Sequence, residues 1–465
     1  MFSKAYFASV ALCASLFSSV SILSVSATPA LQLKSRDSNA ASQLELYKSL
    51  APKAVAIKGA MLGSIRTSWE QGTAAGGILE IDNPEYSVFG YSPFASTGEL
   101  PVGALRLALS AAVRQASDGR LSQVINDGLD GAALDGASSG SVVQLGAITD
   151  STRQQFFQDA VDKQLNYLLN LAPRTSTGAI SMRNDSRAYW NDGVYMGPPF
   201  LAYVGAVTKN KELLQEAYDN CRLYRNALLI DGPYGKLWAH IYSEDDGSFS
   251  DKGLWATGNG WAALGMLRVQ ETISKSDFAS EMTSEVNNLK SWVKEILDGF
   301  FPGVRESDGL LPNYLNNSDT FGDCSGSASL ASVAFRAAVI DPDMFGSNYT
   351  EIAGGLAKAV LSSVDELGVI SPVVDPLSWS NIGELSTEGQ SFGLMLVAAW
   401  RDWLNYCGQD ISGVVTSLIL LYAPQTTRQF ATSYMYSNQI NIYPPSFSGL
   451  FPVVVSVTHG FHTWI

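Results

Sequence analysis

The sequence predicts an all-α fold, an (α/α)6 barrel in which six outer helices surround six inner ones. Three observations lead to this fold: apolar residues recur at helical spacing in twelve segments, the segments alternate between two compositions, and each segment of the second kind begins with a polar cluster. Short connections make successive helices antiparallel, so every second helix points the same way. We therefore expect the six polar clusters to meet on one face of a double ring.

The amphipathic segments, with charges on one side and apolar residues on the other, are predicted to form the outer ring. In chain order they cover residues 41–62, 102–116, 153–171, 211–228, 279–300 and 348–364. The other six segments are poor in charge and rich in Gly, Ala and Ser, which predicts burial on most sides and close approach between neighbouring helices. These inner helices cover residues 66–81, 138–148, 193–208, 258–273, 324–340 and 386–405.

Each predicted inner helix begins with an unusual cluster, in order SWEQGTAAGG, LDGASSGSVV, YWNDGVYMGPPF, WATGNGWAALG, GDCSGSASLAS and STEGQSFGLML. The N–H groups and dipoles of convergent helix N-termini favour a negatively charged ligand. One concave mouth should therefore hold or adjoin six residues of these clusters: Trp69, Asp135, Asp192, Trp261, Asp323 and Glu388. Taken singly, Asp135 and Asp192 could be helix N-caps, a position that Asp fills well. Six clusters in phase favour a binding site.

The chain of 465 residues divides into three predicted parts: a signal peptide at residues 1–27, the barrel at 28–412 and an apolar tail at 413–465. The first part has a Lys near its start, an apolar run and the ending Val25-Ser26-Ala27, of the small-x-small type that signal peptidases cut. We therefore expect a secreted, extracellular protein, and sequons at Asn184, Asn316 and Asn348 agree with a glycoprotein. The tail does not continue the repeat. It is either an appended segment or a small β-like addition packed on the barrel.

The net charge of −14 and a pI of about 4.7 exclude a general electrostatic attraction to nucleic acids or anionic membranes. The sequence has neither a His, Cys and carboxylate cluster with metal-ligand spacing nor a phosphate-binding loop, so it predicts no metal and no cofactor. Once the signal peptide is removed, Cys221, Cys324 and Cys407 remain. At most one disulfide can form, so disulfides are not the scaffold.

Several stretches resemble glycoside hydrolase family 105, the unsaturated rhamnogalacturonyl hydrolases, and especially its secreted fungal members. They are YWNDGVYMGPPFLA, GLWATGNGWAALGMLRV, DCSGSASLASVAFRAA and STEGQSFGLMLVAAWRDW, and the resemblance runs from about Leu44 to Trp403. It implies a six-hairpin toroid and an enzyme that acts on lyase-cut pectin fragments. Such an enzyme removes the terminal 4,5-unsaturated galacturonyl unit by adding water across its double bond.

The resemblance also implies site residues. The catalytic Asp of the family's W-x-D-x-x-x-M-x-x-P-F-L pattern falls on Asp192, and a second site carboxylate falls on Asp135. The family's G-N-G-W and L-W-x-H elements extend the predicted binding site. The substrate-binding residues that we expect are Trp69, Arg183, Trp190, Tyr195, Met196, Trp238, His240, Thr257, Asn259 and Trp261.

One departure concerns the cationic contact to the substrate. Where many relatives carry Arg before G-N-G-W, this chain has Thr257. Arg183 and Arg187 are the nearest candidates to replace that contact, because Arg binds carboxylates with two parallel hydrogen bonds. The alternative is that both are solvated loop residues.

Two other functions stay open at this point. A conventional inverting glycosidase on the same toroid would need an acid and a base about 6.5 to 9.5 Å apart, and Asp135 and Asp192 could serve. A non-catalytic sugar-binding protein would keep the aromatic mouth without turnover. Activity on saturated polysaccharide would indicate the first, and binding of oligosaccharides without turnover would indicate the second.

Overall fold

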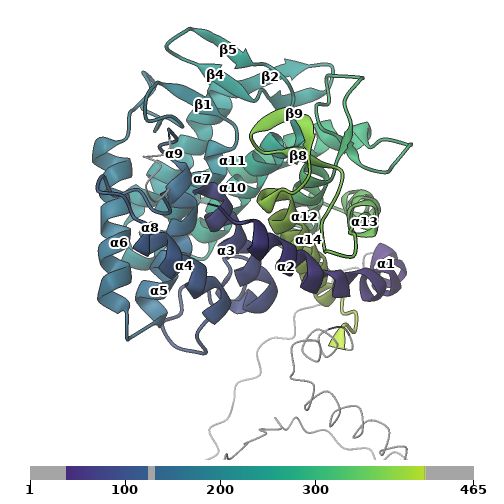
Figure 1. Cartoon of the computed structure of the whole chain (residues 1–465), viewed down its shortest axis with the longest axis horizontal. Helices are drawn as coiled ribbons and strands as arrows, with labels where there is room; N and C mark the ends of the chain where they lie inside the picture. Colours follow the sequence, from purple (N-terminus) through teal and green to yellow (C-terminus); the bar gives the residue numbers. More distant parts are fainter. Residues whose placement is uncertain (1–37, 67, 124–130, 413, 415–465) are drawn as a thin grey trace, which may run out of the picture.

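Figure 1 shows the computed structural model, which describes residues 38–66, 68–123, 131–412 and 414. The predicted signal peptide at residues 1–27 lies outside the described residues, and so does nearly all of the predicted tail at 413–465. The described part of the chain is mainly helical, as the sequence predicts. Within it, no helix is both long and apolar enough to cross a membrane.

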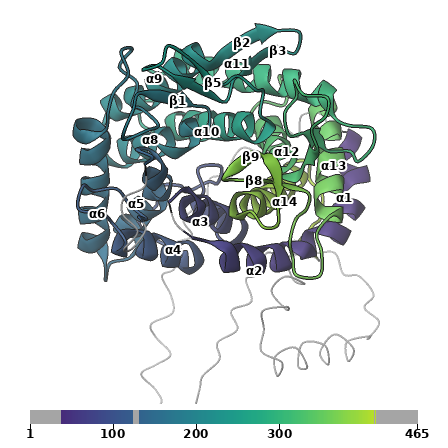
Figure 2. The ribbon, with the colours of Figure 1, turned by 45° about the horizontal axis from the view of Figure 1, so that its top comes forward.

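A ring of buried helices forms the centre of the molecule (Figure 2). Its members are α3 (Trp69–Asp82), α5 (Gly140–Thr149), the pair α7 (Gly193–Met196) and α8 (Pro198–Thr208), α10 (Ala256–Ser274), α12 (Cys324–Ile340) and α14 (Thr387–Tyr406). Each contacts the next in this order, and α14 returns to contact α3, which closes the ring. The six predicted inner helices are confirmed, and the fold is the (α/α)6 barrel.

The amphipathic helices cover the ring from outside. They are α1 (Ser38–Leu50), α2 (Ala54–Ser64), α4 (Val102–Val113), α6 (Gln154–Asn166), α9 (Lys211–Leu228), α11 (Thr283–Phe300) and α13 (Ser347–Ser362). The first predicted outer helix is broken into α1 and α2 by a short 3-10 turn, Ala51–Lys53. Pro52 lies in that turn, and its ring and missing N–H end the α-helical pattern there.

Small residues let the inner helices approach one another. A Cβ atom added to Gly260 would lie 2.0 Å from the Ser329 hydroxyl oxygen, and one added to Gly72 would lie 2.1 Å from that of Ser138. Both glycines are therefore required for packing. This explains the Gly, Ala and Ser content from which the inner ring is predicted.

The connections that lead into the inner helices carry short strands. Strands β1 (Ala188–Trp190), β4 (Ile241–Ser243) and β5 (Ser248–Asp251) form one antiparallel sheet. Three hairpins add β2 (Leu229–Gly232) with β3 (Gly235–Trp238), β6 (Leu311–Pro312) with β7 (Gly322–Asp323), and β8 (Val373–Asp375) with β9 (Ser378–Gly383). With two to six residues each, these strands are too short to give a period-2 signal in the sequence.

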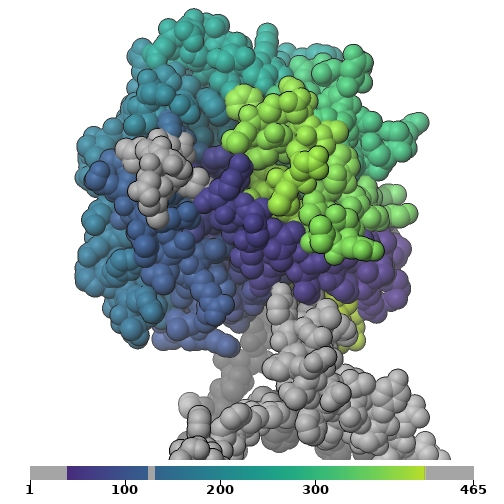
Figure 3. All heavy atoms as spheres, in the orientation of Figure 1, coloured from purple at the N-terminus to yellow at the C-terminus, as the bar shows by residue number. Residues whose placement is uncertain are grey.

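The segment that leads into the last inner helix lies beside the N-terminal part of the described chain. The light-green segment that carries β8 and β9 lies beside the purple N-terminal segment in Figure 3. Thr387, at the start of α14, donates a 2.9 Å hydrogen bond from its hydroxyl to Ser64 at the end of α2. The last inner helix is thereby joined to α2, the second part of the first outer helix.

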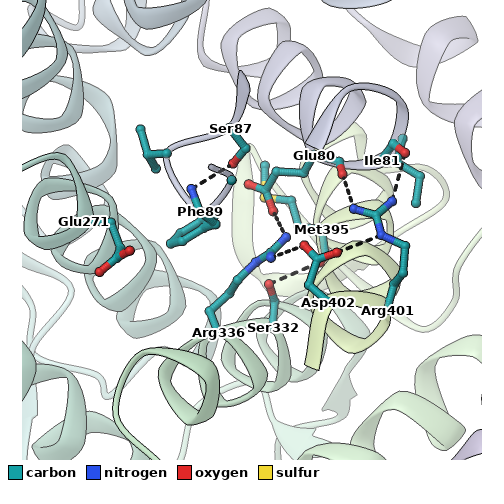
Figure 4. Close-up of polar contacts among 12 residues, drawn as sticks. Glu80, Ile81, Ser87, Phe89, Glu271, Ser332, Arg336, Met395, Arg401 and Asp402 are labelled. Atoms are coloured by element: carbon teal, nitrogen blue, oxygen red, sulfur yellow. Dashed lines mark hydrogen bonds and ion pairs between the residues drawn. The ribbon is translucent and has the colours of Figure 1, made fainter. Parts of the chain in front are cut away.

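A network of charged side chains lies near the C-terminal ends of the inner helices (Figure 4). Glu80 of α3 accepts hydrogen bonds from Arg268 of α10 at 2.5 Å and from Arg336 of α12 at 3.0 Å. Arg336 also pairs with Asp402 of α14, and Arg401 donates to the backbone oxygen of Glu80 at 2.7 Å. Because these charges are paired and hydrogen-bonded, they can be buried between the inner helices.

The three predicted cysteines of the mature chain are Cys221, Cys324 and Cys407, and all are buried. No disulfide joins any two of these described residues. The barrel is therefore held by packing and by its polar networks.

Candidate active site

A cavity of about 220 Å³ opens where the inner helices begin, and we call it the mouth cavity. Its wall contains three carboxyl side chains, one Arg and five Trp side chains. The lining residues are Trp69, Ala132, Asp135, Met182, Arg183, Trp190, Asp192, Met196, Trp255, Trp261, Pro376, Leu377, Trp379 and Glu388. The predicted carboxylates, Asp135 and Asp192, therefore face one space.

Strand β1 delivers Asp192 to the mouth cavity. The strand ends at Trp190, the Asn191 N–H donates to the His240 carbonyl at 3.0 Å, and α7 starts at Gly193. Asp192 occupies the N-cap position of α7, yet its side chain makes no capping hydrogen bond to the helix. Its Oδ1 is fully buried and accepts no hydrogen bond from the described residues. Asp192 is therefore available to a ligand and is not used as a cap.

The surroundings of Asp192 favour its protonated form. Burial raises the pKa of the Asp192 carboxyl. The attraction of the His240 ring and the N–H groups of Asp192 and Gly193 pull the pKa down, but by less than burial raises it. A carboxyl group with a raised pKa keeps its proton to a higher pH than an ordinary Asp does, which suits a general acid.

A backbone pairing brings Asp135 to the same cavity as Asp192. The Ala133 N–H donates to the Met182 carbonyl at 2.7 Å, and the Asn184 N–H donates to the Gly131 carbonyl at 2.8 Å. The chain just before Asp135 thus runs alongside the chain that leads into β1. Asp135 itself is buried at the start of the short 3-10 helix that precedes α5.

Glu388 is a third carboxyl group in the same wall. It lies in the first turn of α14, is 2% exposed, and its Oε1 is buried without a hydrogen-bond partner among the described residues. Burial raises its pKa well above the ordinary Glu value, and the charges of Asp323, Asp192 and Glu70 raise it further. The sequence places Glu388 near the mouth from the cluster STEGQSFG but does not identify it as a binding residue.

Asp323 is expected in or near the mouth, but it does not line the cavity. Its carboxylate caps α12 by accepting hydrogen bonds from the N–H groups of Ser325 at 3.1 Å and Gly326 at 2.8 Å. It also accepts one from the Val374 N–H of β8 at 2.9 Å. Asp323 is therefore an anchor that ties the β8–β9 hairpin to the inner ring.

Trp379 is a lining residue that the sequence prediction missed. It lies on β9, and its ring meets that of Trp190 edge-on with 5.4 Å between centroids. Asn313 fixes two of the aromatic walls, because it donates to the Trp379 carbonyl at 2.7 Å and accepts from the Trp255 ring N–H at 2.9 Å. The stretch VVDPLSWSNIG, with a Pro-containing turn between two apolar runs, is the available hairpin signal.

His240 lies directly behind the aromatic wall. Its ring contacts those of Trp190, Trp255 and Trp379, with centroid distances of 6.0, 4.4 and 4.6 Å. Burial would raise the pKa of Asp251, but hydrogen bonds from His240, Tyr314 and the Gly253 N–H outweigh it and hold the pKa at about 2. Because an ionised Asp251 can only accept, His240 Nδ1 donates to it at 2.9 Å. The other ring nitrogen, Nε2, is buried without a partner in the described chain.

The two candidate arginines have different positions. Arg183 lines the mouth cavity, lies 5.8 Å from the centre of the Trp190 ring, and pairs with Asp185 at 2.8 Å. Among the described residues, it is the one cationic side chain in the cavity lining. Arg187 is outside the lining, where it pairs with Asp245 at 2.7 Å and with Glu244 at 3.6 Å.

Trp238 and Asn259 are predicted binding residues that the structure places in the core. Trp238 is 0% exposed, and neither residue lines the mouth cavity. The Asn259 amide accepts from the Trp238 N–H at 3.0 Å and donates to the carbonyls of Trp238 at 2.9 Å and Trp255 at 3.0 Å. With every amide group bonded to backbone, Asn259 holds β3 against the start of α10.

Thr257 and Tyr195 also lie outside the lining. The buried Thr257 hydroxyl donates to Asp323 at 2.7 Å, so it points toward the cap of α12. Tyr195 lines a smaller cavity deeper in the barrel, where its ring packs on Trp261 with 4.7 Å between centroids. Met196 lines both cavities and separates them. Thr257 therefore gives the cavity no contact in place of the Arg that many relatives carry. The cationic side chain in the lining is Arg183.

A family model described as Glycosyl Hydrolase Family 88 matches residues 110–376 of this chain. That segment contains both predicted carboxylates, Asp135 and Asp192, and the β1 and α7 elements between which Asp192 lies. No curated protein matches the sequence.

Solved structures with the same fold have low sequence identity to this chain. A possible member of the GH105 family from Klebsiella pneumoniae has 12% identity and a TM-score of 0.60, over 76% of this chain and 93% of that one. An unsaturated glucuronyl hydrolase from Bacillus sp. GL1, described as responsible for glycosaminoglycan degradation, has 14% identity and a TM-score of 0.52, over 75% and 96%. A structure described as UGL with dGlcA-Glc-Rha-Glc has 16% identity and a TM-score of 0.51, over 75% and 95%.

Proposed function

The chain belongs to Glycosyl Hydrolase Family 88, and from that membership we propose that it is an unsaturated rhamnogalacturonyl hydrolase of the family 105 type. Its substrate is an oligosaccharide that a lyase has cut from rhamnogalacturonan, with a 4,5-unsaturated galacturonyl residue at its end. The reaction adds water across the double bond and releases the neighbouring sugar.

The observation that carries this proposal is the state of Asp192. Its buried Oδ1 has no partner among the described residues, its side chain does not cap α7, and its raised pKa keeps a proton available. A carboxyl group held in this way at a cavity wall costs stability unless a ligand uses it. Asp192 thus has the properties of a general acid.

We assign the steps as follows. Asp192 gives its proton to C4 of the unsaturated ring while C5 gains positive character. The resulting carboxylate takes a proton from water as that water attacks C5, which restores the Asp192 acid and forms a hemiketal. The hemiketal opens and releases the neighbouring sugar with its hydroxyl group. Asp135, which faces the same cavity, orients the attacking water by hydrogen bonding.

Recognition of the uronate is assigned to charge and to aromatic surfaces. Arg183 supplies a cation for the C6 carboxylate, assisted by the N-termini of the inner helices. The Trp side chains of the wall supply flat apolar surfaces for the sugar rings.

We also propose that the enzyme is secreted and glycosylated. Asn184, Asn316 and Asn348 are all exposed, as glycan acceptors must be. The test is to express the full chain in a fungal host, recover it from the medium, and determine its N-terminal sequence and its mass before and after deglycosylation. A first residue directly after Ala27 is the expected result, and retention of the protein in the cells would contradict it.

The activity is tested with lyase-digested rhamnogalacturonan. The conjugated double bond absorbs ultraviolet light, so we expect the absorbance to fall as water is added. A matched substrate ending in an unsaturated glucuronyl unit tests the preference for galacturonyl. Unchanged absorbance with release of reducing ends from saturated polysaccharide would indicate a conventional glycosidase. Binding without any turnover would indicate a sugar-binding protein.

A further inference from the structure

The wall of the mouth cavity contains a buried acceptor for which the steps above have no use. Glu388 Oε1 is fully buried and has no hydrogen-bond partner among the described residues, while the residue as a whole is 2% exposed. Native proteins seldom leave such an atom unsatisfied, because a buried polar group without a partner opposes folding. A ligand in the cavity can provide the missing partner.

A purely structural role for Glu388 leaves its Oε1 unexplained. The N-terminus of α14 is already capped by Ser386, whose hydroxyl oxygen accepts from the Gly389 N–H at 3.2 Å. The Trp69 side chain lies close enough to Glu388 to lower the pKa of its carboxyl group, and Trp69 also lines the cavity. Glu388 and Trp69 are therefore neighbours in the wall, and Glu388 Oε1 has no partner among the described residues.

Glu388 and Arg183 lie on opposite walls. The inner ring runs α3, α5, α8, α10, α12 and α14, so α14 is three helices away from the α7–α8 pair and faces it across the barrel. Arg183 belongs to the segment that leads into β1 and α7. A sugar bound between these walls would have one edge at the cation and the other at Glu388.

The charges on the two walls orient the ligand. Among the described residues of the lining, Arg183 is the one cationic side chain, so its wall attracts an anionic group, whereas the opposite wall presents the carboxyl group of Glu388. The uronate carboxylate, on C5, is then directed to Arg183. The hydroxyl groups on C2 and C3, which lie across the ring from C5, are directed to Glu388. Hydroxyls can donate to Oε1 and also accept from the carboxyl group if it is protonated.

We propose that Glu388 binds the ring hydroxyl groups of the unsaturated uronate, as a third substrate-binding carboxyl group of the site. This assignment rests on the proposed function, because it takes an unsaturated uronyl oligosaccharide as the ligand. Its role is to hold the sugar with C4 and C5 facing Asp192, and not to transfer a proton.

The test compares two substitutions of similar size. Glu388→Gln keeps a hydrogen-bonding group, whereas Glu388→Met removes it and keeps the volume. We expect Glu388→Met to raise KM by about 10-fold to 100-fold, the usual range for loss of a hydrogen bond to a charged or buried group, with a much smaller effect on kcat. Glu388→Gln should stay within about 5-fold of the wild type in KM, because an amide can also pair with a hydroxyl.

The matched control is Glu271→Gln. Glu271 is also a buried carboxyl on an inner helix, but it lies outside the mouth cavity and pairs with Lys275 at 3.3 Å. We expect its KM to be that of the wild type. A second readout is the dissociation constant of the unsaturated disaccharide, measured by calorimetry in an Asp192→Asn background with and without Glu388→Met.

The outcomes separate this inference from the proposed function. If the wild type hydrates an unsaturated uronyl substrate and the folded Glu388→Met variant has an unchanged KM, the inference alone is overturned. If the wild type neither binds nor hydrates any such substrate, the inference and the proposed function are both overturned. If Glu388→Met does not fold, Glu388→Ala replaces it. Equal loss of stability in the Met, Ala and Gln variants would show a structural role and overturn the inference.

Discussion

At the scale of single residues, Asp192 gives the sharpest prediction. Asp192→Asn keeps the shape of the side chain and removes the proton that must be transferred. We expect the variant to fold and to bind unsaturated oligosaccharide, but to lose about 10²-fold to 10⁴-fold in turnover, the usual contribution of a general acid or base. The measurement is the absorbance assay together with calorimetric binding. Near-normal turnover in the Asp192→Asn variant would show that Asp192 is not the general acid.

Arg183 is predicted to act in binding. Arg183→Ala should raise KM by about 10-fold or more and lower kcat much less, because a contact to the carboxylate is present in both the bound substrate and the transition state. Arg187→Ala is the control, since Arg187 pairs with Asp245 outside the cavity lining. Equal effects of the two substitutions would show that general surface charge, and not Arg183, attracts the substrate.

Glu388 should make the stability of the enzyme depend on pH. Burial raises its pKa, so the folded state keeps a proton that the unfolded state loses above the ordinary Glu pKa of about 4.3. The stability contribution of Glu388 therefore falls as pH rises from that value through the raised pKa. Glu388→Gln has no such proton and should gain stability relative to the wild type as pH rises from the ordinary Glu pKa toward the raised one. Denaturant unfolding at several pH values measures this gain, and a pH-independent difference would contradict it.

The sequence predicts individual site residues unevenly, and helix geometry explains why. Asp135, Asp192, Trp69 and Trp261 lie at or near the starts of inner helices, and the structure brings all four to the mouth cavity. Asn259 belongs to the same G-N-G-W stretch as Trp261 but lies two residues before it, about 200° around the helix, so it faces the core. A one-dimensional pattern does not say which way each of its members points.

At the scale of elements, the β8–β9 hairpin should depend on two hydrogen bonds for its position in the wall of the mouth cavity. Asn313 donates to the Trp379 carbonyl, and Asp323 accepts from the Val374 N–H. Asn313→Ala removes the first anchor and leaves the buried Trp255 ring N–H without its acceptor, which costs about 1 to 3 kcal/mol. We expect faster hydrogen exchange across residues 373–383 and a raised KM.

The control for the hairpin is Ser378→Ala. Its hydroxyl accepts only an exposed hydrogen bond, from Asn381 at 2.8 Å. Exchange rates in this variant should match the wild type. If Asn313→Ala leaves exchange in the hairpin unchanged, the hairpin is held by its other contacts and Asn313 is not its anchor.

Helices and hairpins differ in how far the sequence predicts them. The inner helices are long enough to show both their period and their low charge, and their predicted bounds agree with α3, α10, α12 and α14 within a few residues. The hairpins are set by register and by contacts such as that of Asn313 with Trp379, which are 66 residues apart. Short strands of this kind have no local signal strong enough to predict them.

At the scale of the whole molecule, the charged network opposite the mouth should stabilise the barrel without affecting catalysis. Glu80→Ala leaves Arg268 and Arg336 buried without their shared anion, so we expect it to cost about 3 to 5 kcal/mol in unfolding free energy. Glu80 lies eleven residues after Trp69 on α3, about 16 Å along the helix, so KM at low temperature should not change.

The control for this network is Lys211→Ala. Lys211 pairs with Glu281 at 2.8 Å on the surface, and such pairs contribute at most about 1 kcal/mol. Urea unfolding of both variants measures the difference. If both substitutions lower the unfolding free energy by a similar amount, the buried network contributes no more stability than a surface ion pair does. The network could not be predicted from the sequence, because Glu80 and Arg336 are 256 residues apart.

The contact between α3 and α14 has a consequence for synthesis of the protein. These are the first and last inner helices, and Trp69 of α3 and Glu388 of α14 both line the mouth cavity where the two helices meet. While the chain emerges from the ribosome, at about 5 to 20 residues per second, the growing barrel has no sixth wall and its apolar interior faces solvent. A nascent chain that ends before residue 387 would lack α14. It would therefore lack both the contact that closes the ring of inner helices and the carboxyl group of Glu388. The binding site is therefore complete only when the last inner helix docks against the first.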